Sequence, residues 1–307
     1  RNLPRVYVRQ ERLKAQGSGE HGVQRLHVIG AGVMGGDIAA WSAYRGIQVT
    51  LQDREQAYID KALERAQELF SRRVKDDAKR PEVAARLKSD LEGAGLAEAD
   101  LVIEAIIEDA DAKRGLYAQV EPKLGPDALL TSNTSSIPLA ELATGLQRPA
   151  RFAGLHYFNP VAKMPLVEIV RHDAMDPATA QRLASFCRAI GKLPVPVAGT
   201  PGFLVNRLLM PYLNEATWCL QEGAATAADI DAALTEFGMP MGPLELADTV
   251  GLGIVAAAGR QLAGDDAMPR CLNMHLSRKS LGRKTGRGFY EWKDGKPKRL
   301  ATAEEAE

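Results

Sequence analysis

His156 and Glu168 are the two side chains whose types and spacing best suit catalysis. His156 lies in the segment GLHYFNP (154–160), and Glu168 follows 12 residues later in LVEIV (166–170). Both segments have the apolar character of short strands, and prolines mark the connection between them. Two such strands would place an imidazole near a carboxylate. A histidine held by a carboxylate is a general base that works near neutral pH.

Each of these residues also has a purely structural interpretation. A histidine in an apolar strand is commonly a hydrogen-bonded core residue, and Glu168 could be a surface residue on an edge strand. Their joint placement near strand ends favours catalysis, because ligands of open α/β sheets collect at the carboxyl ends of the strands.

A glycine motif far upstream predicts a dinucleotide site. Gly30, Gly32 and Gly35 form GxGxxG directly after an apolar run (26–29) and before a predicted helix (34–44). The first glycine permits a tight turn, the second lets the backbone approach a pyrophosphate, and the third lets the helix pack on the strand. The helix N-terminus would offer N–H groups to the phosphates. The alternative is an ordinary glycine-tolerant turn.

Asp53 follows Gly30 by 23 residues, at the end of a second predicted strand (49–53). An acid at this place can accept hydrogen bonds from both ribose hydroxyls and would repel a 2′-phosphate, which favours NAD over NADP. Arg54 is a counter-indication, because arginine can accommodate a 2′-phosphate.

Three further polar positions stand where a ligand could lie. The run Ser132–Ser136 follows a predicted strand, and its five small polar residues exceed what a helix cap or turn needs. Asn159 precedes a proline three residues after His156, where a turn asparagine is the alternative. Asn206 lies in the first turns of a predicted helix, where an exposed polar position is the alternative.

The element pattern predicts an α/β fold, a Rossmann-like doubly wound sheet followed by a smaller all-α C-terminal domain. Strands and helices alternate up to residue 198, which is typical of a mostly parallel sheet with helices on both faces. No convincing strand follows residue 199. The predicted strands span 26–29, 49–53, 101–104, 129–132, 152–157, 166–170 and 193–197, and the predicted helices span 34–44, 56–73, part of 81–91, 203–222, 226–237, a stretch from Pro243, and 269–278.

These elements give a predicted domain order. Residues 1–22 would be a linker remnant, 23–198 the NAD-binding domain, 199–292 a helical domain, and 293–307 a polar tail. A role of the helical domain in substrate binding and dimerisation is implied only by the family resemblance given below.

The composition excludes several classes of protein. The 39 basic and 39 acidic residues cancel, which argues against a generally basic nucleic-acid binder. No stretch approaches the roughly 18 consecutive apolar residues of a membrane span. The three cysteines (187, 219 and 271) are few and widely spaced, so we expect no disulfide framework, no metal site and a reducing, cytoplasmic compartment.

The motifs together resemble the L-3-hydroxyacyl-CoA dehydrogenases of fatty-acid β-oxidation, over residues 23 to 292. Eight separated motifs in one order make the resemblance specific. They are GAGVMGGDIA from Gly30, DLVIEAIIED from Asp100, SNTSS from Ser132, FAGLHYFNP from Phe152, PLVEIV from Pro165, TPGFLVNR from Thr200, PMGPLELAD from Pro240 and GRKTGRGFY from Gly282.

The resemblance implies catalytic roles for five residues. His156 would take the proton of the substrate 3-hydroxyl, and Glu168 would orient His156 and stabilise its imidazolium. Ser135 and Asn206 would hydrogen-bond the hydroxyl or ketone oxygen and hold the nicotinamide end, and Asn159 would position the pair or the substrate.

The resemblance also implies ligands and partners. Asp53 would bind the adenosine ribose of NAD, Glu108 and Lys113 would line the cofactor site, and the substrate would be an acyl-CoA thioester. The basic residues of segment 60–91 could contact CoA or form a solvated face. Alternatives are a dehydrogenase of another 3-hydroxy acid or sugar acid, or a non-catalytic protein that kept the fold.

The ends of the chain suggest a multifunctional origin under the same resemblance. Residues 6–14 look like the linker that follows a hydratase domain in multifunctional β-oxidation enzymes, and their second helical repeat is absent. We therefore expect an excised dehydrogenase segment. Apolar surface within residues 203–262 would be exposed unless it pairs, which predicts a homodimer through the helical domain.

Overall fold

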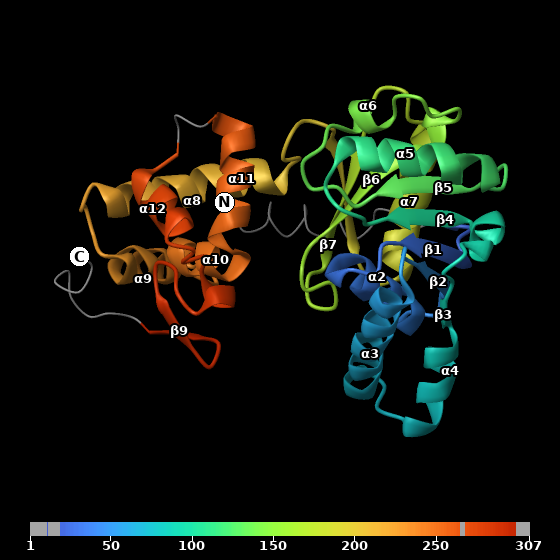
Figure 1. Ribbon diagram of the computed structural model, residues 1–307, viewed down its shortest axis with the longest axis horizontal. Helices are drawn as coiled ribbons and strands as arrows, with labels where there is room; N and C mark the ends of the chain where they lie inside the picture. Colours follow the sequence, from blue (N-terminus) through green and yellow to red (C-terminus); the bar gives the residue numbers. More distant parts are fainter. Residues whose placement is uncertain (1–10, 12–18, 265–267, 299–307) are drawn as a thin grey trace. The chain divides into compact units, whose positions relative to one another are not determined.

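The computed structural model describes Glu11 and residues 19–264 and 268–298 of the 307-residue chain (Figure 1). The chain divides into two compact units, residues 1–203 and 204–307, whereas the sequence predicted the division after residue 198. Most of the expected linker, residues 1–10 and 12–18, lies outside the described residues, as does the end of the expected tail, residues 299–307.

An eight-stranded sheet forms the centre of the first unit, in the order β3-β2-β1-β4-β5-β6-β7-β8 (Figure 1). Neighbouring strands are parallel except β6 and β7, which pair antiparallel. The predicted Rossmann-like, mostly parallel sheet is therefore confirmed. The strands are β1 (Arg25–Ile29), β2 (Gln48–Gln52), β3 (Leu87–Ser89), β4 (Leu101–Glu104), β5 (Leu129–Ser132), β6 (Phe152–Tyr157), β7 (Leu166–Arg171) and β8 (Leu193–Ala198).

Helices cover both faces of this sheet because its central strands are apolar on both sides. On one face α2, α3 and α7 bury side chains such as Ile38, Phe70 and Phe186. On the other face α5 and α6 bury Tyr117 and Leu142. The helices are α2 (Val33–Tyr44), α3 (Gln56–Arg73), α4 (Arg80–Ala85), α5 (Ala110–Val120), α6 (Leu139–Leu142) and α7 (Pro177–Ala189), with 3₁₀ turns η1 (Asp77–Lys79), η2 (Ala94–Glu98), η3 (Glu121–Lys123) and η4 (Pro149–Arg151).

The prediction of helix over 81–91 is correct only for its first part. α4 ends at Ala85, and residues 87–89 form the edge strand β3, paired in parallel with β2. A strand of three residues is too short to show the alternation that marks a strand in a sequence, and pairing with its neighbour decides its conformation.

The second unit is helical, as predicted, and its bounds differ in detail. Thr226 caps α9 as expected, because its hydroxyl accepts the Asp229 N–H. The helix that begins at Pro243 ends at Val250, and Gly251 separates it from a further helix. The elements are α8 (Val205–Gln221), α9 (Ala227–Phe237), α10 (Pro243–Val250), α11 (Leu252–Ala263), α12 (Arg270–Ser277) and η6 (Arg283–Thr285).

A short hairpin corrects the expectation that no strand follows residue 199. β9 (Glu291–Lys293) and β10 (Lys296–Lys298) pair antiparallel across Asp294 and Gly295, which both have positive φ. Asp-Gly is the preferred sequence of such a two-residue turn. The sequence therefore contains the turn dipeptide, but the polar residues on both sides of it do not show the apolar alternation of a strand.

Two buried carboxylates fasten the segment before this hairpin to the helices. Asp248 on α10 accepts hydrogen bonds from the Phe289 and Tyr290 N–H groups and from the Trp292 indole. Asp231 on α9 accepts the Tyr290 hydroxyl at 2.7 Å. Burial, and to a smaller extent the nearby Asp231 charge, raises the pKa of Asp248 above its usual range despite these donors. The carboxylates thus attach this segment to α9 and α10 by hydrogen bonds.

Candidate functional site

The histidine and glutamate predicted to meet do meet, across β6 and β7. His156 and Glu168 are directly opposed in the antiparallel register. The imidazole Nδ1 lies 2.7 Å from the Glu168 Oε2, and both side chains are buried, Glu168 completely. Because a carboxylate accepts, Nδ1 carries a proton, and in the neutral imidazole Nε2 then keeps its lone pair. Glu168 is therefore an internal partner of the histidine and not an edge-strand surface residue.

Two phenylalanines enclose the imidazole. The ring of Phe158 lies 4.5 Å from the His156 ring, centroid to centroid, and that of Phe203 lies 5.6 Å away. Phe158 belongs to the loop after β6, so the position of that loop helps to set the position of the imidazole. The ring is thus fixed by a carboxylate on one edge and by aromatic contacts.

The polar run Ser132–Ser136 lies beside the histidine strand. The side chain of Asn133 accepts the Tyr157 N–H at 2.9 Å, and the Asn133 N–H donates to the Glu104 carbonyl at 2.8 Å. One residue of the run thus joins β4, β5 and the end of β6. The sequence singled out the run but not this particular asparagine.

Glu108 organises the exposed part of the same run. Its Oε1 accepts from the Thr134 hydroxyl at 2.6 Å and from the N–H groups of Ser135 and Ser136 at 2.8 and 3.1 Å. The Ser135 hydroxyl lies 3.3 Å from the same oxygen. Burial alone would raise the pKa of Glu108, but these donors and the Lys113 charge outweigh it and lower that pKa. Ser135 and Glu108, predicted as catalytic and cofactor residues, therefore lie together.

Lys113 lies beneath this run, paired with carboxylates. Its ammonium is 2.6 Å from Glu104 Oε1 and 3.5 Å from Glu108 Oε2, and its side chain is 1% exposed. Glu104 also accepts the Tyr117 and Ser132 hydroxyls at 2.6 and 2.8 Å. Glu104 thus holds Lys113 and Ser132 in place, and the sequence did not identify it. Its only sequence signal is an acid that ends the apolar run LVIE.

The glycine motif forms the predicted turn between β1 and α2. Gly30 has a φ of 106°, and a Cβ there would lie 2.5 Å from the Ala105 carbonyl oxygen. A Cβ on Gly35 would lie 1.8 Å from the Gly30 carbonyl oxygen. Both positions therefore require glycine for the fold itself.

Gly32 is different, because a Cβ there would meet nothing within 4 Å. Packing does not demand glycine at the N-cap of α2, whereas close approach of a ligand would. Asp53 lies beside this turn, since its Oδ2 accepts the Ala31 N–H at 2.6 Å. The open position, the helix N-terminus and the adjacent carboxylate fit a dinucleotide.

No contact within the described part of the chain joins Asn159 to the histidine pair. Asn159 is exposed in the loop after β6, where its bond to Pro160 is cis. Asn206 lies in the first turn of α8, in the second unit. The roles of both asparagines remain predictions.

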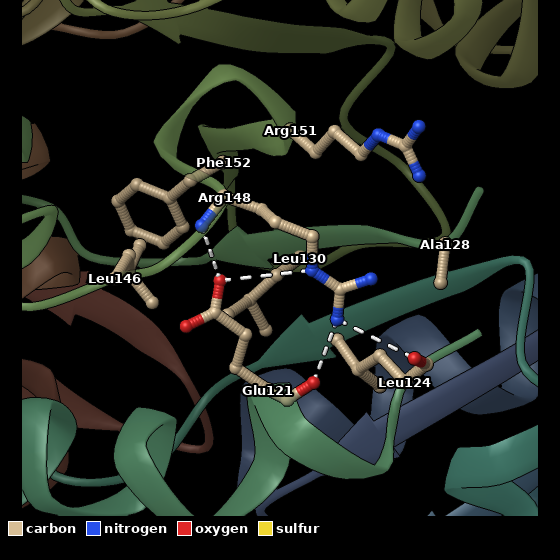
Figure 2. A pocket seen from close by; sticks show the side chains of 8 residues that line it. All are labelled: Glu121, Leu124, Ala128, Leu130, Leu146, Arg148, Arg151 and Phe152. Atoms are coloured by element: carbon tan, nitrogen blue, oxygen red, sulfur yellow. Dashed lines mark hydrogen bonds and ion pairs between the residues drawn. The ribbon is translucent and has the colours of Figure 1, made fainter. Parts of the chain in front are cut away.

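A small cavity opens where β5 and β6 begin, at the other end of these strands from the polar run that follows β5. Figure 2 shows the side chains that line it. Figure 2 shows Arg148 directed at the Glu121 carboxylate, which also accepts the Gln147 and Arg148 N–H groups at 2.8 and 2.7 Å. Arg148 further donates to the carbonyls of Glu121 and Gly125. These bonds close the connection between η3 and β5, so the cavity is a packing feature and not the dinucleotide site.

Two other kinds of feature are absent from the described residues. No helix among them is long and apolar enough to cross a membrane. No group of histidine, cysteine, aspartate or glutamate side chains in those same residues could hold a metal ion.

Known proteins match both units of the chain. Residues 25–200 match the family profile described as 3-hydroxyacyl-CoA dehydrogenase, NAD binding domain, and residues 202–292 match the one described as 3-hydroxyacyl-CoA dehydrogenase, C-terminal domain. The fatty acid oxidation complex subunit alpha of Psychrobacter arcticus is 37% identical over 294 residues, which are 92% of this chain and 41% of that protein.

Two crystal structures are similar over nearly their whole length. FadB2 of M. tuberculosis is 37% identical with a TM-score of 0.83, over 88% of this chain and 99% of that chain. The (S)-3-hydroxybutyryl-CoA dehydrogenase PaaH1 of Ralstonia eutropha is 34% identical with a TM-score of 0.84, over 89% and 100%. The chain thus spans less than half of the Psychrobacter subunit and almost all of these two proteins.

Proposed function

The chain belongs to the 3-hydroxyacyl-CoA dehydrogenase family, and we propose that it oxidises (S)-3-hydroxyacyl-CoA to 3-ketoacyl-CoA with NAD. The observation that carries this proposal is the buried His156–Glu168 pair, 2.7 Å apart, in a unit whose residues 25–200 are an NAD-binding domain. A general base and a hydride acceptor are the two requirements of alcohol oxidation.

His156 acts as the base through Nε2 in this proposal. Glu168 holds Nδ1, so Nε2 is the nitrogen that takes the proton of the substrate 3-hydroxyl. The Glu168 charge then stabilises the imidazolium that forms. Bound NAD supplies the acceptor for the hydride of the same carbon. General base catalysis of this kind contributes on the order of 10²–10⁴-fold to the rate.

The first unit offers NAD a set of groups that matches its parts. The N-terminus of α2 and the open side of Gly32 suit the pyrophosphate, and Asp53 suits the adenosine ribose hydroxyls. Glu108 and Lys113 are proposed to line the cofactor site, with Glu108 the more exposed of the two at 36% against 1%.

Three polar residues are proposed to hold the acyl-CoA substrate or the nicotinamide end. Ser135 would exchange its Glu108 contact for the substrate oxygen, and Asn206 would donate to that same oxygen. Asn159, exposed three residues after the base, would position the substrate. The motifs SNTSS, HYFNP and VNR support these roles.

One assay tests this function. NADH oxidation is followed with acetoacetyl-CoA and with free acetoacetate. Activity with the thioester alone supports the proposal, activity with the free acid supports a dehydrogenase of another 3-hydroxy acid, and inactivity with both supports a non-catalytic protein. His156→Gln should lower turnover by at least about 10²-fold while NAD still binds. Unchanged turnover of this variant would exclude His156 as the base.

We also propose that the chain forms a homodimer through its helical unit. Large apolar side chains are exposed there, among them Phe237 at 84% and Leu208 at 69%. Such side chains mark interaction surfaces when they lie together. Light scattering at micromolar concentration should give twice the mass of one chain, and Leu208→Asp should reduce it to one. A monomeric wild-type chain would contradict the proposal.

The likeness to the Psychrobacter subunit supports a last part of the proposal, that the chain is the dehydrogenase segment of a multifunctional fatty-acid oxidation enzyme. An antibody raised against this segment should detect a native polypeptide much larger than 33.2 kDa in the source cells. A native band of 33.2 kDa would instead place the chain with single-function dehydrogenases.

A further inference from the structure

The loop between β6 and β7, residues 158–165 and here called the β6–β7 loop, connects the two strands of the catalytic pair. It begins with Phe158, whose ring contacts the His156 ring, and with the exposed Asn159. A displacement of this loop would therefore move one wall of the imidazole and a proposed substrate-positioning side chain together.

A buried lysine holds this loop from the protein interior. The Lys192 ammonium, between α7 and β8, donates to the carbonyls of Val161 and Met164, the latter at 2.7 Å. The whole residue is 3% exposed. The next residue, Leu193, donates its N–H to the Pro165 carbonyl at 2.7 Å. The second half of the loop is thus attached to the start of β8.

An indole completes the surroundings of the ammonium. The Lys192 Nζ lies 4.4 Å from the centroid of the Trp41 ring, which is a cation–π distance. The Trp41 N–H donates to the Ile190 carbonyl at 2.9 Å, so the indole is itself fixed. An ammonium has three N–H bonds, and two carbonyls with one aromatic face account for all of them.

A second cation holds the loop from the outside. The exposed Arg73, at the end of α3, donates to the Ala162 carbonyl at 3.0 Å. Its guanidinium lies 5.7 Å from the centroid of the same Trp41 ring. Carbonyls of three loop residues are therefore held by two cations from separate elements, and Trp41 lies against both.

We propose that Lys192, assisted by Arg73, is a positioning residue for catalysis, which fixes the β6–β7 loop and through Phe158 the His156 imidazole. This inference rests on the proposed function. A buried ammonium is costly, and neutral donors could close a loop whose position did not matter. Misplacement of a reacting group by about 1 Å can cost on the order of 10²-fold in rate, which gives a catalytic reason to hold it.

Charged and titratable groups from several elements face the Lys192 ammonium. They are Cys187 on α7, Arg73 on α3 and Arg45 after α2. Burial lowers the pKa of Lys192 to about 8, and the arginines act in the same direction against the thiol. The Tyr157 hydroxyl, near that thiol, stays neutral because burial raises its pKa. The hydrogen bonds from Lys192 to the loop carbonyls should therefore weaken above about pH 8, where the ammonium loses its charge.

A matched pair of substitutions tests the proposal. Lys192→Met keeps length and apolar contact but removes the donors, and Lys163→Met makes the same change at an exposed loop lysine. We expect Lys192→Met to lower kcat for acetoacetyl-CoA reduction about tenfold or more, with KM for NADH nearly unchanged. Lys163→Met should keep both constants. Arg73→Met, at an exposed position, should lower kcat less and in the same direction.

Trp41 supplies a readout that does not depend on turnover. In a background with Trp218 and Trp292 replaced by phenylalanine, Trp41 fluorescence should titrate near pH 8, and Lys192→Met should abolish this transition. The decrease in kcat that follows loss of the Lys192 charge near pH 8 should be missing in the same variant.

The outcomes separate this inference from the proposed function. An active wild-type chain whose kcat and pH profile are unchanged by Lys192→Met overturns the positioning role. A wild-type chain inactive on acetoacetyl-CoA overturns the function instead. If Lys192→Met does not fold by circular dichroism, Arg73→Met decides, and a wild-type kcat in that variant overturns the proposal.

Discussion

Replacement of Glu168 by glutamine isolates the electrostatic part of the catalytic pair. Glutamine keeps the shape and can still accept the Nδ1–H, so the imidazole stays oriented. What it removes is the negative charge 2.7 Å from Nδ1, in a side chain with no solvent exposure. Unit charges about 4 Å apart at an effective dielectric constant of about 20 interact by about 4 kcal/mol.

That energy sets the expected size of the effect. The imidazolium exists only after proton transfer has begun, so the lost attraction raises the barrier and hardly changes binding. Since about 1.4 kcal/mol corresponds to a factor of ten, kcat should fall by roughly 10²–10³-fold, with KM nearly constant. Single-turnover measurement of NAD reduction by an (S)-3-hydroxyacyl-CoA substrate reports the chemical step in this direction.

Glu121→Gln is the matched control for this substitution. Glu121 is also a buried carboxylate with backbone N–H donors, but it lies at the cavity where β5 and β6 begin (Figure 2). The Glu121→Gln variant should be less stable than the wild type and should keep the kcat of the wild type. If Glu168→Gln kept kcat within about threefold of the wild type, or if both variants lost it equally, the charge of Glu168 would have no special part in catalysis.

Three further predictions concern the cofactor turn, the buried lysine and the helical unit. Gly32→Ala should have the melting temperature of the wild type, and its affinity for NAD by calorimetry should be lower by about tenfold or more. Gly35→Ala should fail to fold normally, because its Cβ would lie 1.8 Å from a carbonyl oxygen. Equal behaviour of the two variants would contradict this prediction. Burial lowers the pKa of Lys192 from 10.5 to about 8, so between these pH values the unfolded chain binds more protons than the folded chain. The free energy of unfolding should therefore rise with pH across this window, by roughly 3 kcal/mol at most. Urea titrations of Lys192→Met should lack this rise. Asp248→Ala should lower the stability of the helical unit by about 3 kcal/mol, because one buried and two partly buried donors lose their acceptor. A shift below about 1 kcal/mol in urea would show that these donors find other partners.

The parts of the fold that the sequence predicted are those with strong local patterns. β4, β5 and β6 have the predicted bounds because each is an apolar run ended by polar residues, and α3 has the predicted bounds because its apolar face recurs every turn. β3 was missed because three residues paired at a sheet edge carry too short a pattern.

The candidate site shows the same division. His156 and Glu168 could be paired from the sequence because both lie in strands joined by one short connection. The environment of Lys113 could not be predicted from the sequence. Its partner Glu104 has only the pattern of a strand end, and the two side chains meet because α5 packs on the sheet. Lys192 gave no signal either, because its acceptors are backbone carbonyls, which every residue possesses.

The antiparallel pairing of β6 and β7 affects the order in which parts of the site can form during folding. The histidine–glutamate pair belongs to a hairpin, so its contact order is low and its loop-closure entropy is small. The bond from Ala31 to Asp53, and that from Tyr157 to Asn133, each span a crossover helix that must dock first. The contact between His156 and Glu168 therefore needs less of the chain to be ordered than the dinucleotide site does. Destabilising substitutions in the crossover helices should accordingly impair cofactor affinity before they impair the geometry of the pair.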